Sequence, residues 1–262
     1  MKIVTFNIKI QDARDQENQF YVRYPSIVRK IREETPDIIG VQEMNETMEM
    51  LLRAALPEYD FLGAGREAGL KGERTSILCR RETITPYGYR MFWLSDTPDV
   101  IGSRYGEQGH WPRICVAASI RHNQTGALMR IYNTHLDHKS DTARTKGLQL
   151  ILKTIAQDQA GERLPVFLTG DMNFMPDKEQ YKLFSDPSLY PMRVLTEGLK
   201  STCNHFNIKV WDEPIDYILT NAALPDFKIS QWHNNEKGMP YSDHDAICAE
   251  FEIPGEGLTL ET

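Results

Sequence analysis

Short strand-like runs outnumber helical patterns along this chain, and this imbalance constrains the fold most. The runs that read as strands are residues 3–8, 38–41, 76–80, 83–94, 113–120, 128–135, 166–168, 215–220, 227–232 and 246–253. Apolar stripes with helical spacing occur at 24–31, 44–55 and 148–155, and prolines end the first two. So many strands exceed one comfortable sheet, and each sheet must bury an apolar face. We therefore predict two sheets packed together, with helices outside them.

No Ser-, Gly- or Pro-rich linker and no block of like charges divides the chain. The simplest organisation is one domain over residues 1–262.

Composition excludes several functions. The 30 Lys and Arg residues against 37 Asp and Glu residues give a net charge of −7, so no overall positive field attracts long nucleic acids. No apolar stretch approaches the roughly 20 residues that a membrane helix needs. The four widely separated cysteines favour reduced thiols in the core. The polar Asn7 comes too early for a secretion signal, so we expect a cytoplasmic protein.

Acidic, amide and imidazole side chains recur where apolar strands end or begin. They are Asn7, Glu43, His135 with Asp137, Asp171 with Asn173, Asp216, and Asp243 with His244. Each one alone is explained by a turn or a cap, but strand ends can converge on one cleft. Asp216 is the hardest to explain as a turn or a cap. Its apolar neighbours require that it be partly buried, and a buried carboxylate needs a polar partner.

The residue types favour a hard divalent cation. Carboxylates and amides such as Glu43, Asp171, Asp243 and Asn7 suit Mg²⁺, with Mn²⁺ as a possible substitute, whereas zinc would require more His or Cys. No Ser or Cys lies in an elbow motif, so attack by water is favoured over a covalent intermediate.

These segments, taken in order, resemble the endonuclease/exonuclease/phosphatase superfamily, in its bacterial-type branch of metal-dependent hydrolases. The matching segments are residues 1–8 (MKIVTFNI), 36–43 (PDIIGVQE), 133–138 (NTHLDH), 169–173 (TGDMN), 215–218 (IDYI) and 242–244 (SDH). The resemblance implies an α/β four-layer sandwich, in which two mixed β-sheets pack face to face with helices on the outer faces. It also implies hydrolysis of phosphate esters.

The resemblance further implies roles for the cation and the water. Glu43 would be the principal Mg²⁺ ligand, with Asn7 and Asp243 beside it in the metal shell. Asp171 and Asn173 would orient and deprotonate the attacking water.

Other matching residues would contact the phosphate. His244, hydrogen-bonded to Asp216, would donate to a phosphate oxygen, and His135 would contact the phosphate from the opposite side. Arg113, in a segment that also looks like the bacterial branch, would bind substrate, although a surface ion pair explains it equally well.

The resemblance does not identify which phosphate ester is the substrate. A phosphodiester is our first expectation, in a small molecule or a short nucleic acid, and no obligate protein partner is evident. The alternatives are a phosphomonoester of a small metabolite and a catalytically silent protein that binds phosphate compounds. Asp245, beside the site, would disfavour polyanions. A base or sugar could stack on Trp93, Trp111, Trp211 or Trp232, although packing explains most of them.

A zinc hydrolase is a further alternative. Residues 135–138 overlap the Asp-His end of a metallo-β-lactamase-type motif, but Asn133 stands where that motif has its upstream histidine.

Overall fold

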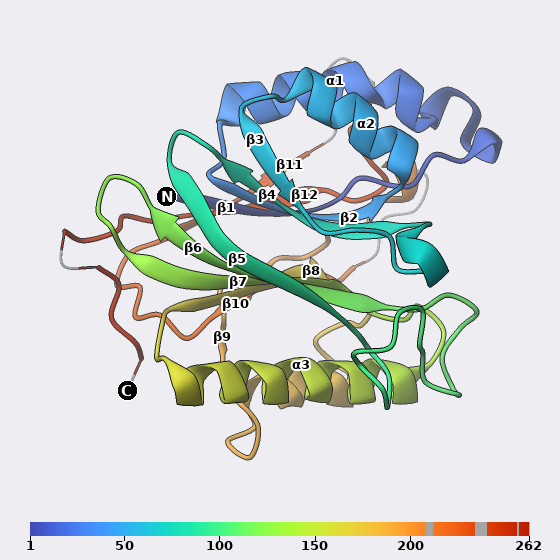
Figure 1. Ribbon diagram of the computed structural model, residues 1–262. Coiled ribbons are helices and arrows are strands. Elements are labelled where there is room, and N and C mark those ends of the chain that lie inside the picture. Colours follow the sequence, from blue (N-terminus) through green and yellow to red (C-terminus); the bar gives the residue numbers. More distant parts are fainter. Residues whose placement is uncertain (208–211, 234–239, 256, 262) are drawn as a thin grey trace.

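Two mixed β-sheets of six strands each form the centre of the molecule in a computed structural model, which describes residues 1–207, 212–233, 240–255 and 257–261. The sheets lie face to face, with α1 and α2 on the outer face of one and α3 on the outer face of the other (Figure 1). This confirms the four-layer α/β sandwich.

The first sheet has the strand order β11-β12-β1-β2-β4-β3. Its strands are β1 (Lys2–Asn7), β2 (Ile38–Met44), β3 (Tyr59–Leu62), β4 (Arg74–Arg80), β11 (Lys228–Trp232) and β12 (Ala246–Glu250). β1 pairs parallel with β2 and antiparallel with β12, so the end of β1 lies beside the end of β2 and the start of β12.

The second sheet has the order β5-β6-β7-β8-β10-β9. Its strands are β5 (Ile84–Trp93), β6 (Ile114–His122), β7 (Leu128–His135), β8 (Val166–Asp171), β9 (Arg193–Val194) and β10 (Asp216–Thr220). β7 and β8 are parallel, and the register places His135 and Asp216 on either side of Asp171.

Capping residues fix where the helices begin. The α-helices are α1 (Phe20–Glu34), α2 (Glu46–Ala55) and α3 (Asp141–Gly161), and the short 3₁₀ turns are η1 (Ala13–Asn18), η2 (Ala68–Leu70), η3 (Glu179–Ser185) and η4 (His205–Asn207). The side chain of Asn45 accepts from the backbone N–H of Met48, and Ser140 caps α3 in the same way. Because Asn45 is a cap, β2 runs on to Met44, and the predicted helix over 44–55 starts two residues too early.

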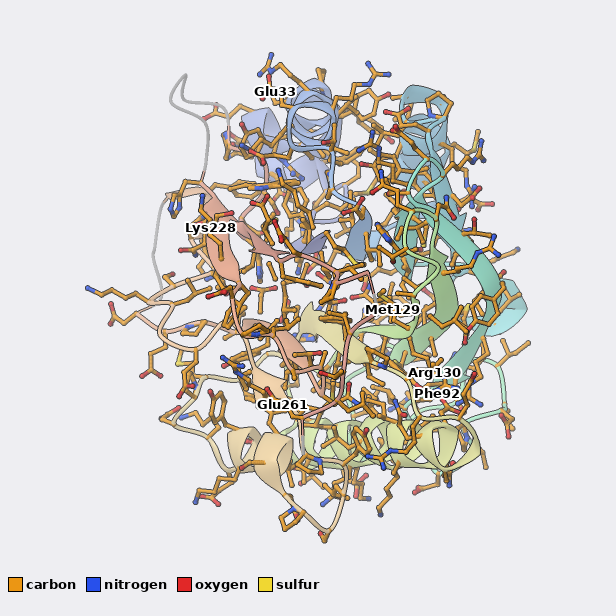
Figure 2. The ribbon with its side chains drawn as sticks, turned by 90° about the vertical axis from the view of Figure 1, so that its left-hand side faces the viewer. Glu33, Phe92, Met129, Arg130, Lys228 and Glu261 are labelled. Carbon is orange, nitrogen blue, oxygen red and sulfur yellow. The ribbon has the colours of Figure 1, made fainter. Side chains whose placement is uncertain are left out.

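Apolar side chains fill all three interfaces between the layers. One cluster lies between α1, α2 and the first sheet, another beneath α3, and a third between the sheets. Met129 lies fully buried in the layer between the sheets, whereas Glu33 and Lys228 lie at the outside (Figure 2). All four cysteines are buried and free, as predicted.

A buried polar contact joins the two sheets between β7 and the facing strands β2 and β4. The Nδ2 of Asn133 on β7 donates to the carbonyls of Val41 (3.0 Å) and Ser76 (2.9 Å) in the opposite sheet. A Cβ added at Gly40 would lie 2.3 Å from Thr169 Oγ1, so the sheets approach closely at this position. Asn133 therefore fixes the spacing between β2 and β7.

Two sequence expectations about strands differ from the structure. The last strand ends at Glu250 rather than at residue 253: the backbone N–H of Phe251 still bonds to the carbonyl of Met1, but residues 252 and 253 pair with no described strand. β3 and β9 were not predicted, since they have only four and two residues.

Within the described ranges, the structure has no helix with the length and apolar character needed to cross a membrane.

Candidate active site

The predicted site residues meet at one edge of the sandwich. A cavity of about 580 Å³ lies there, and its wall includes Glu43, Arg113, His135, Asp171, Asn173, Asp243 and His244. Asn7 and Asp216 are fully buried directly behind this wall. The parallel pairs β1–β2 and β7–β8 end at the same edge, which is why residues far apart in sequence come together.

Asn7 links the two sheets directly behind the cavity wall. Its Nδ2 donates to Glu43 Oε1 and to Asp171 Oδ2, both at 3.0 Å. Its Oδ1 accepts from the backbone N–H of Lys9 at 3.0 Å. The amide therefore holds one carboxylate of each sheet at a fixed separation.

Lys9, which the sequence analysis missed, places a positive charge between two predicted cation ligands. Its Nζ lies 3.9 Å from Glu43 Oε2 and 3.7 Å from Asp243 Oδ2. Burial opposes the charged form, but both carboxylates outweigh it and raise the pKa of Lys9. Burial by itself raises the pKa of Glu43, yet Lys9 and His135 together hold it below its usual range. Carboxylate oxygens that converge on one positive group are ligands of the kind that suit Mg²⁺ or Mn²⁺.

A second group also has the spacing of a metal site. Ligand atoms of Asp171, Asp216 and His244 all lie within 4.8 Å of one another. His244 Nδ1 and Asp216 Oδ2 are already hydrogen-bonded at 2.9 Å. A cation there would have to replace that short buried bond, whereas at Glu43 and Asp243 it would replace only the longer contacts of 3.9 and 3.7 Å with Lys9, so this pair fits a metal better.

His244 and Asp216 form a buried dyad. Thr202, missed by the sequence analysis, donates its hydroxyl to the same Asp216 oxygen at 2.6 Å. Burial disfavours the charged imidazole, but the adjacent Asp216 carboxylate outweighs it and raises the pKa of His244 well above its usual range. Burial also raises the pKa of Asp216. The partner that the apolar surroundings of Asp216 required is thus His244.

Asp171 lies at the centre of the site. Its Oδ1 accepts from the backbone N–H of Asn173 at 2.9 Å, a bond made possible by the left-handed conformation of Asn173. Its Oδ2 lies 3.5 Å from His135 Nε2 and 4.0 Å from His244 Nε2. Two imidazoles therefore flank one carboxylate that faces the cavity.

Two arginines also line the cavity, Arg66 from the segment before β4 and Arg113 directly before β6. Arg113 Nη2 lies 3.0 Å from His138 Nδ1, while the buried Arg113 Nε and Nη1 have no hydrogen-bond partner. Arg66 is paired with Glu73, and Glu73 Oε1 is 3.5 Å from His135 Nδ1. Sequence reasoning missed Arg66 and Glu73, which lie in a loop without apolar periodicity. The glycines around that loop were the available signal.

The other polar residues that the sequence analysis singled out have structural roles or lie outside the cavity wall. Asp137 caps the turn after β7 by accepting from the N–H groups of Lys139 and Ser140. Asp245 is held by Asn204 and His233 and is not part of the cavity wall. Asn133, where a zinc motif would have histidine, is committed to bridging the sheets.

Of the tryptophans, only one described ring lines the cavity. Trp111 is 44% exposed and forms part of the wall. Trp93 and Trp232 are buried, and Trp93 donates its ring N–H to the carbonyl of Arg66. Trp211 lies outside the described residues.

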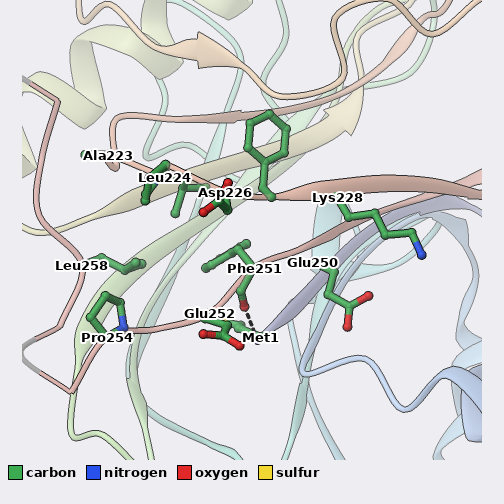
Figure 3. A pocket seen from close by; sticks show the side chains of 12 residues that line it. Met1, Ala223, Leu224, Asp226, Lys228, Glu250, Phe251, Glu252, Pro254 and Leu258 are labelled. Carbon is green, nitrogen blue, oxygen red and sulfur yellow. Dashed lines mark hydrogen bonds between the residues drawn. The ribbon is translucent and has the colours of Figure 1, made fainter.

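Another cavity, of about 910 Å³, lies near the amino terminus, at the other end of β1 (Figure 3). The Met1 ammonium donates to the carbonyl of Phe251 there. Asp226, Glu250 and Glu252 line it. Among its described lining residues Lys228 is the only Lys or Arg and there is no His, so this cavity lacks the imidazole and guanidinium groups that line the first one.

Comparisons with known proteins give a consistent result. A family model described as the Endonuclease/Exonuclease/phosphatase family matches residues 4–244. The chain is similar to an endonuclease/exonuclease/phosphatase from Bacteroides vulgatus, with 27% identity, a TM-score of 0.86 and coverage of 99% of this chain and 98% of the other. It is also similar to a mannosyl-6-phosphatase from Bacteroides thetaiotaomicron, with 26% identity, a TM-score of 0.84 and coverage of 97% and 100%.

A curated relative is similar over a shorter region. It is the RNA exonuclease NGL1 of Saccharomyces cerevisiae, with 26% identity over 54% of this chain and 49% of the relative. The match therefore spans about half the length of that protein.

Proposed function

This chain belongs to the endonuclease/exonuclease/phosphatase family, whose members hydrolyse phosphate esters, and we propose that it removes the phosphate from a small phosphorylated molecule with the help of Mg²⁺ or Mn²⁺. One observation carries the proposal: a single cavity brings together two carboxylates that can hold a cation, the imidazoles of His135 and His244, and two arginines. Its volume of about 580 Å³ lies in the range of small-ligand pockets, roughly 300–1,000 Å³.

Glu43 and Asp243 would hold the cation, with Asn7 orienting Glu43 beside it. A divalent cation there would neutralise phosphate charge and favour attack at phosphorus.

Asp171 would act on the water. Its position at the cavity wall, held by Asn7 and by the backbone of Asn173, lets it accept a proton as the water oxygen bonds to phosphorus. The bond from phosphorus to the leaving oxygen then breaks, the leaving oxygen takes up a proton from solvent and Asp171 releases its proton to solvent, so inorganic phosphate and an alcohol are the products.

His244 and His135 would contact the phosphate. The Asp216 carboxylate orients the His244 ring and favours its charged form, so its Nε2 can donate to a phosphate oxygen. His135, on the other side of Asp171, would contact the phosphate from the opposite direction. Arg113 would bind a phosphate oxygen or a neighbouring group of the substrate.

One comparison favours a monoester over the diester that we first expected. The cavity wall carries Lys9, Arg66 and Arg113 but also five carboxylates, so a phosphomonoester, with about two negative charges at neutral pH, would depend on the divalent cation as well as on these three residues. The mannosyl-6-phosphatase, similar over nearly the whole chain, supports this choice. The exposed face of Trp111 offers a surface on which a sugar ring can pack.

A phosphodiester is the second candidate. The similarity to an RNA exonuclease favours it, although that similarity covers only about half of each protein. Trp111 would then stack on a base.

The four buried, free thiols support the proposal that the protein works in a reducing compartment such as the cytoplasm.

The test is a comparison of kcat/KM for mannose 6-phosphate, p-nitrophenyl phosphate and bis(p-nitrophenyl) phosphate with Mg²⁺ or Mn²⁺. We expect at least one monoester to exceed the diester about tenfold or more. A clear preference for the diester would select the second candidate. Saturable binding of the monoesters without turnover would indicate a silent binding protein.

A further inference from the structure

Arg23 of α1 is a buried arginine that binds the backbone on both sides of the proposed cation site. We infer that Arg23 is a positioning residue, which sets the separation between the segment that carries Asn7 and the segment that carries Asp243. The inference rests on the proposed cation site in Glu43 and Asp243. Arg23 would thereby control the affinity of that site for the cation, because it fixes the position of the backbone that carries the ligands.

The contacts of Arg23 are with carbonyl groups from three parts of the chain. Nη1 donates to the carbonyls of Ile8 and Tyr241, and Nη2 donates to that of Lys9 at 3.0 Å. Nε donates to the carbonyl of Asn18. Ile8 and Lys9 directly follow Asn7, and Tyr241 comes two residues before Asp243. One rigid guanidinium therefore holds both segments at a distance fixed by its own geometry.

The surroundings of Arg23 keep it in place and charged. The side chain is fully buried, and the rings of Phe20 and Phe206 lie 5.9 and 5.4 Å from its guanidinium carbon. Burial lowers its pKa to about 10, so the group remains protonated at neutral pH. The four hydrogen bonds of its guanidinium described above all go to carbonyl oxygens, and the carboxylates of Asp243 and Glu43 act on its charge from a distance.

Two other side-chain contacts join the segments that Arg23 holds. The Ser242 hydroxyl donates to the carbonyl of Asn7 at 2.7 Å, and Lys9 Nζ lies 3.7 Å from Asp243 Oδ2. Lys9 has a left-handed backbone with φ of 55°, so regular strand pairing does not define its conformation. Without Arg23, the buried carbonyls of Ile8 and Tyr241 would lose a charged donor, and the spacing of the two segments would be less tightly fixed.

The experiment measures Mn²⁺ affinity by calorimetry, without substrate, in the wild-type protein and in Arg23→Met, Arg23→Lys and Arg29→Met. Residues that orient metal ligands typically contribute about 10–100-fold to affinity. We expect the Mn²⁺ Kd to rise about 10–100-fold in Arg23→Met and less in Arg23→Lys, which keeps the charge but contacts fewer carbonyls. Arg29 is exposed on the same helix, so Arg29→Met should stay within about twofold.

Circular dichroism on the same samples separates positioning from folding. If Arg23→Met does not fold, Arg23→Lys carries the test, and addition of methylguanidinium to Arg23→Ala should restore Mn²⁺ binding. A folded Arg23→Lys or Arg23→Met variant that binds Mn²⁺ as tightly as the wild type would overturn the inference. Failure of the proposed function gives a different pattern, in which the wild type binds Mn²⁺ more tightly than the Arg23 variants but hydrolyses no phosphate ester.

Discussion

Replacing Asp216 by Asn tests the dyad with little change of shape. Asp216 is 1% exposed, and its Oδ2 lies 2.9 Å from His244 Nδ1. The amide keeps the size of the carboxylate but removes the charge that favours a protonated His244 and fixes its ring. The imidazole would then lose its role as a charged donor to the phosphate.

The size of the effect follows from that one bond. A hydrogen bond to a charged group contributes about 1.5–3 kcal/mol, and each 1.36 kcal/mol is a factor of ten in rate, so kcat/KM should fall roughly 10- to 150-fold. Stability should change little, because His244 can release its proton and leave no buried charge without a partner. A loss of about 1 kcal/mol corresponds to about 2–4 °C in Tm for a chain of this size.

The assay is release of inorganic phosphate from the preferred substrate, with Tm measured on the same samples. Asp177→Asn is the matched control, since Asp177 is exposed at the surface and paired only with Lys178 in the described contacts. A kcat/KM for Asp216→Asn within twofold of that of the control would refute the role of the dyad. A loss of activity accompanied by unfolding would assign Asp216 to stability instead.

Three further predictions concern the cation, the substrate and the packing of the sheets. Glu43→Gln should weaken Mn²⁺ binding about tenfold or more by calorimetry, because it removes a charged oxygen next to the proposed cation position. Arg113→Met should raise KM for a phosphomonoester more than it lowers kcat, since it removes a cation from the cavity wall. Gly40→Ala should lower the free energy of unfolding by about 1–3 kcal/mol or more, measured by urea denaturation, because its Cβ would lie 2.3 Å from Thr169 Oγ1 and 2.6 Å from Asn133 Oδ1.

Each of these changes has a neutral counterpart nearby. The control for Glu43→Gln is Glu46→Gln, in the first turn of α2, and the control for Arg113→Met is Arg121→Met, at an exposed position of β6. The control for Gly40→Ala is Gly88→Ala, where the added Cβ would lie in open space. Equal Mn²⁺ affinity of Glu43→Gln and Glu46→Gln would count against the cation position. Equal KM values for Arg113→Met and Arg121→Met would remove Arg113 from the substrate site. If Gly40→Ala is as stable as Gly88→Ala, the sheets do not pack closely at Gly40.

The architecture could be predicted from sequence because strand patterns and prolines are local signals. Ile27, Val28 and Ile31 form one buried face of α1, as their spacing indicates, and the helix ends just before Pro36. β9 could not be found, since its two residues are a strand only through pairing with β10. Met44 was placed in the wrong element because its apolar character suits both the end of β2 and the start of a helix.

The candidate site shows the same division between local and long-range information. Asp216 could be predicted to need a buried partner from its apolar neighbours alone, and the structure provides His244. The roles of Lys9 and Arg23 could not be predicted, because each depends on contacts with segments more than 200 residues away, near Asp243. Nothing in a local pattern distinguishes Arg23 from the exposed Arg29 on the same helix.

The most direct test of the account is the rate of phosphate release from a phosphomonoester with Mg²⁺, with Mn²⁺ and with excess chelator, using Asp171→Ala and His244→Ala as comparisons. The account predicts turnover that requires the cation, is abolished by chelator and returns when the cation is restored. It also predicts that both variants stay folded and lose most activity. Near-native activity in both variants, or hydrolysis that persists in chelator, would contradict a cation-dependent phosphate ester hydrolase centred on this cavity.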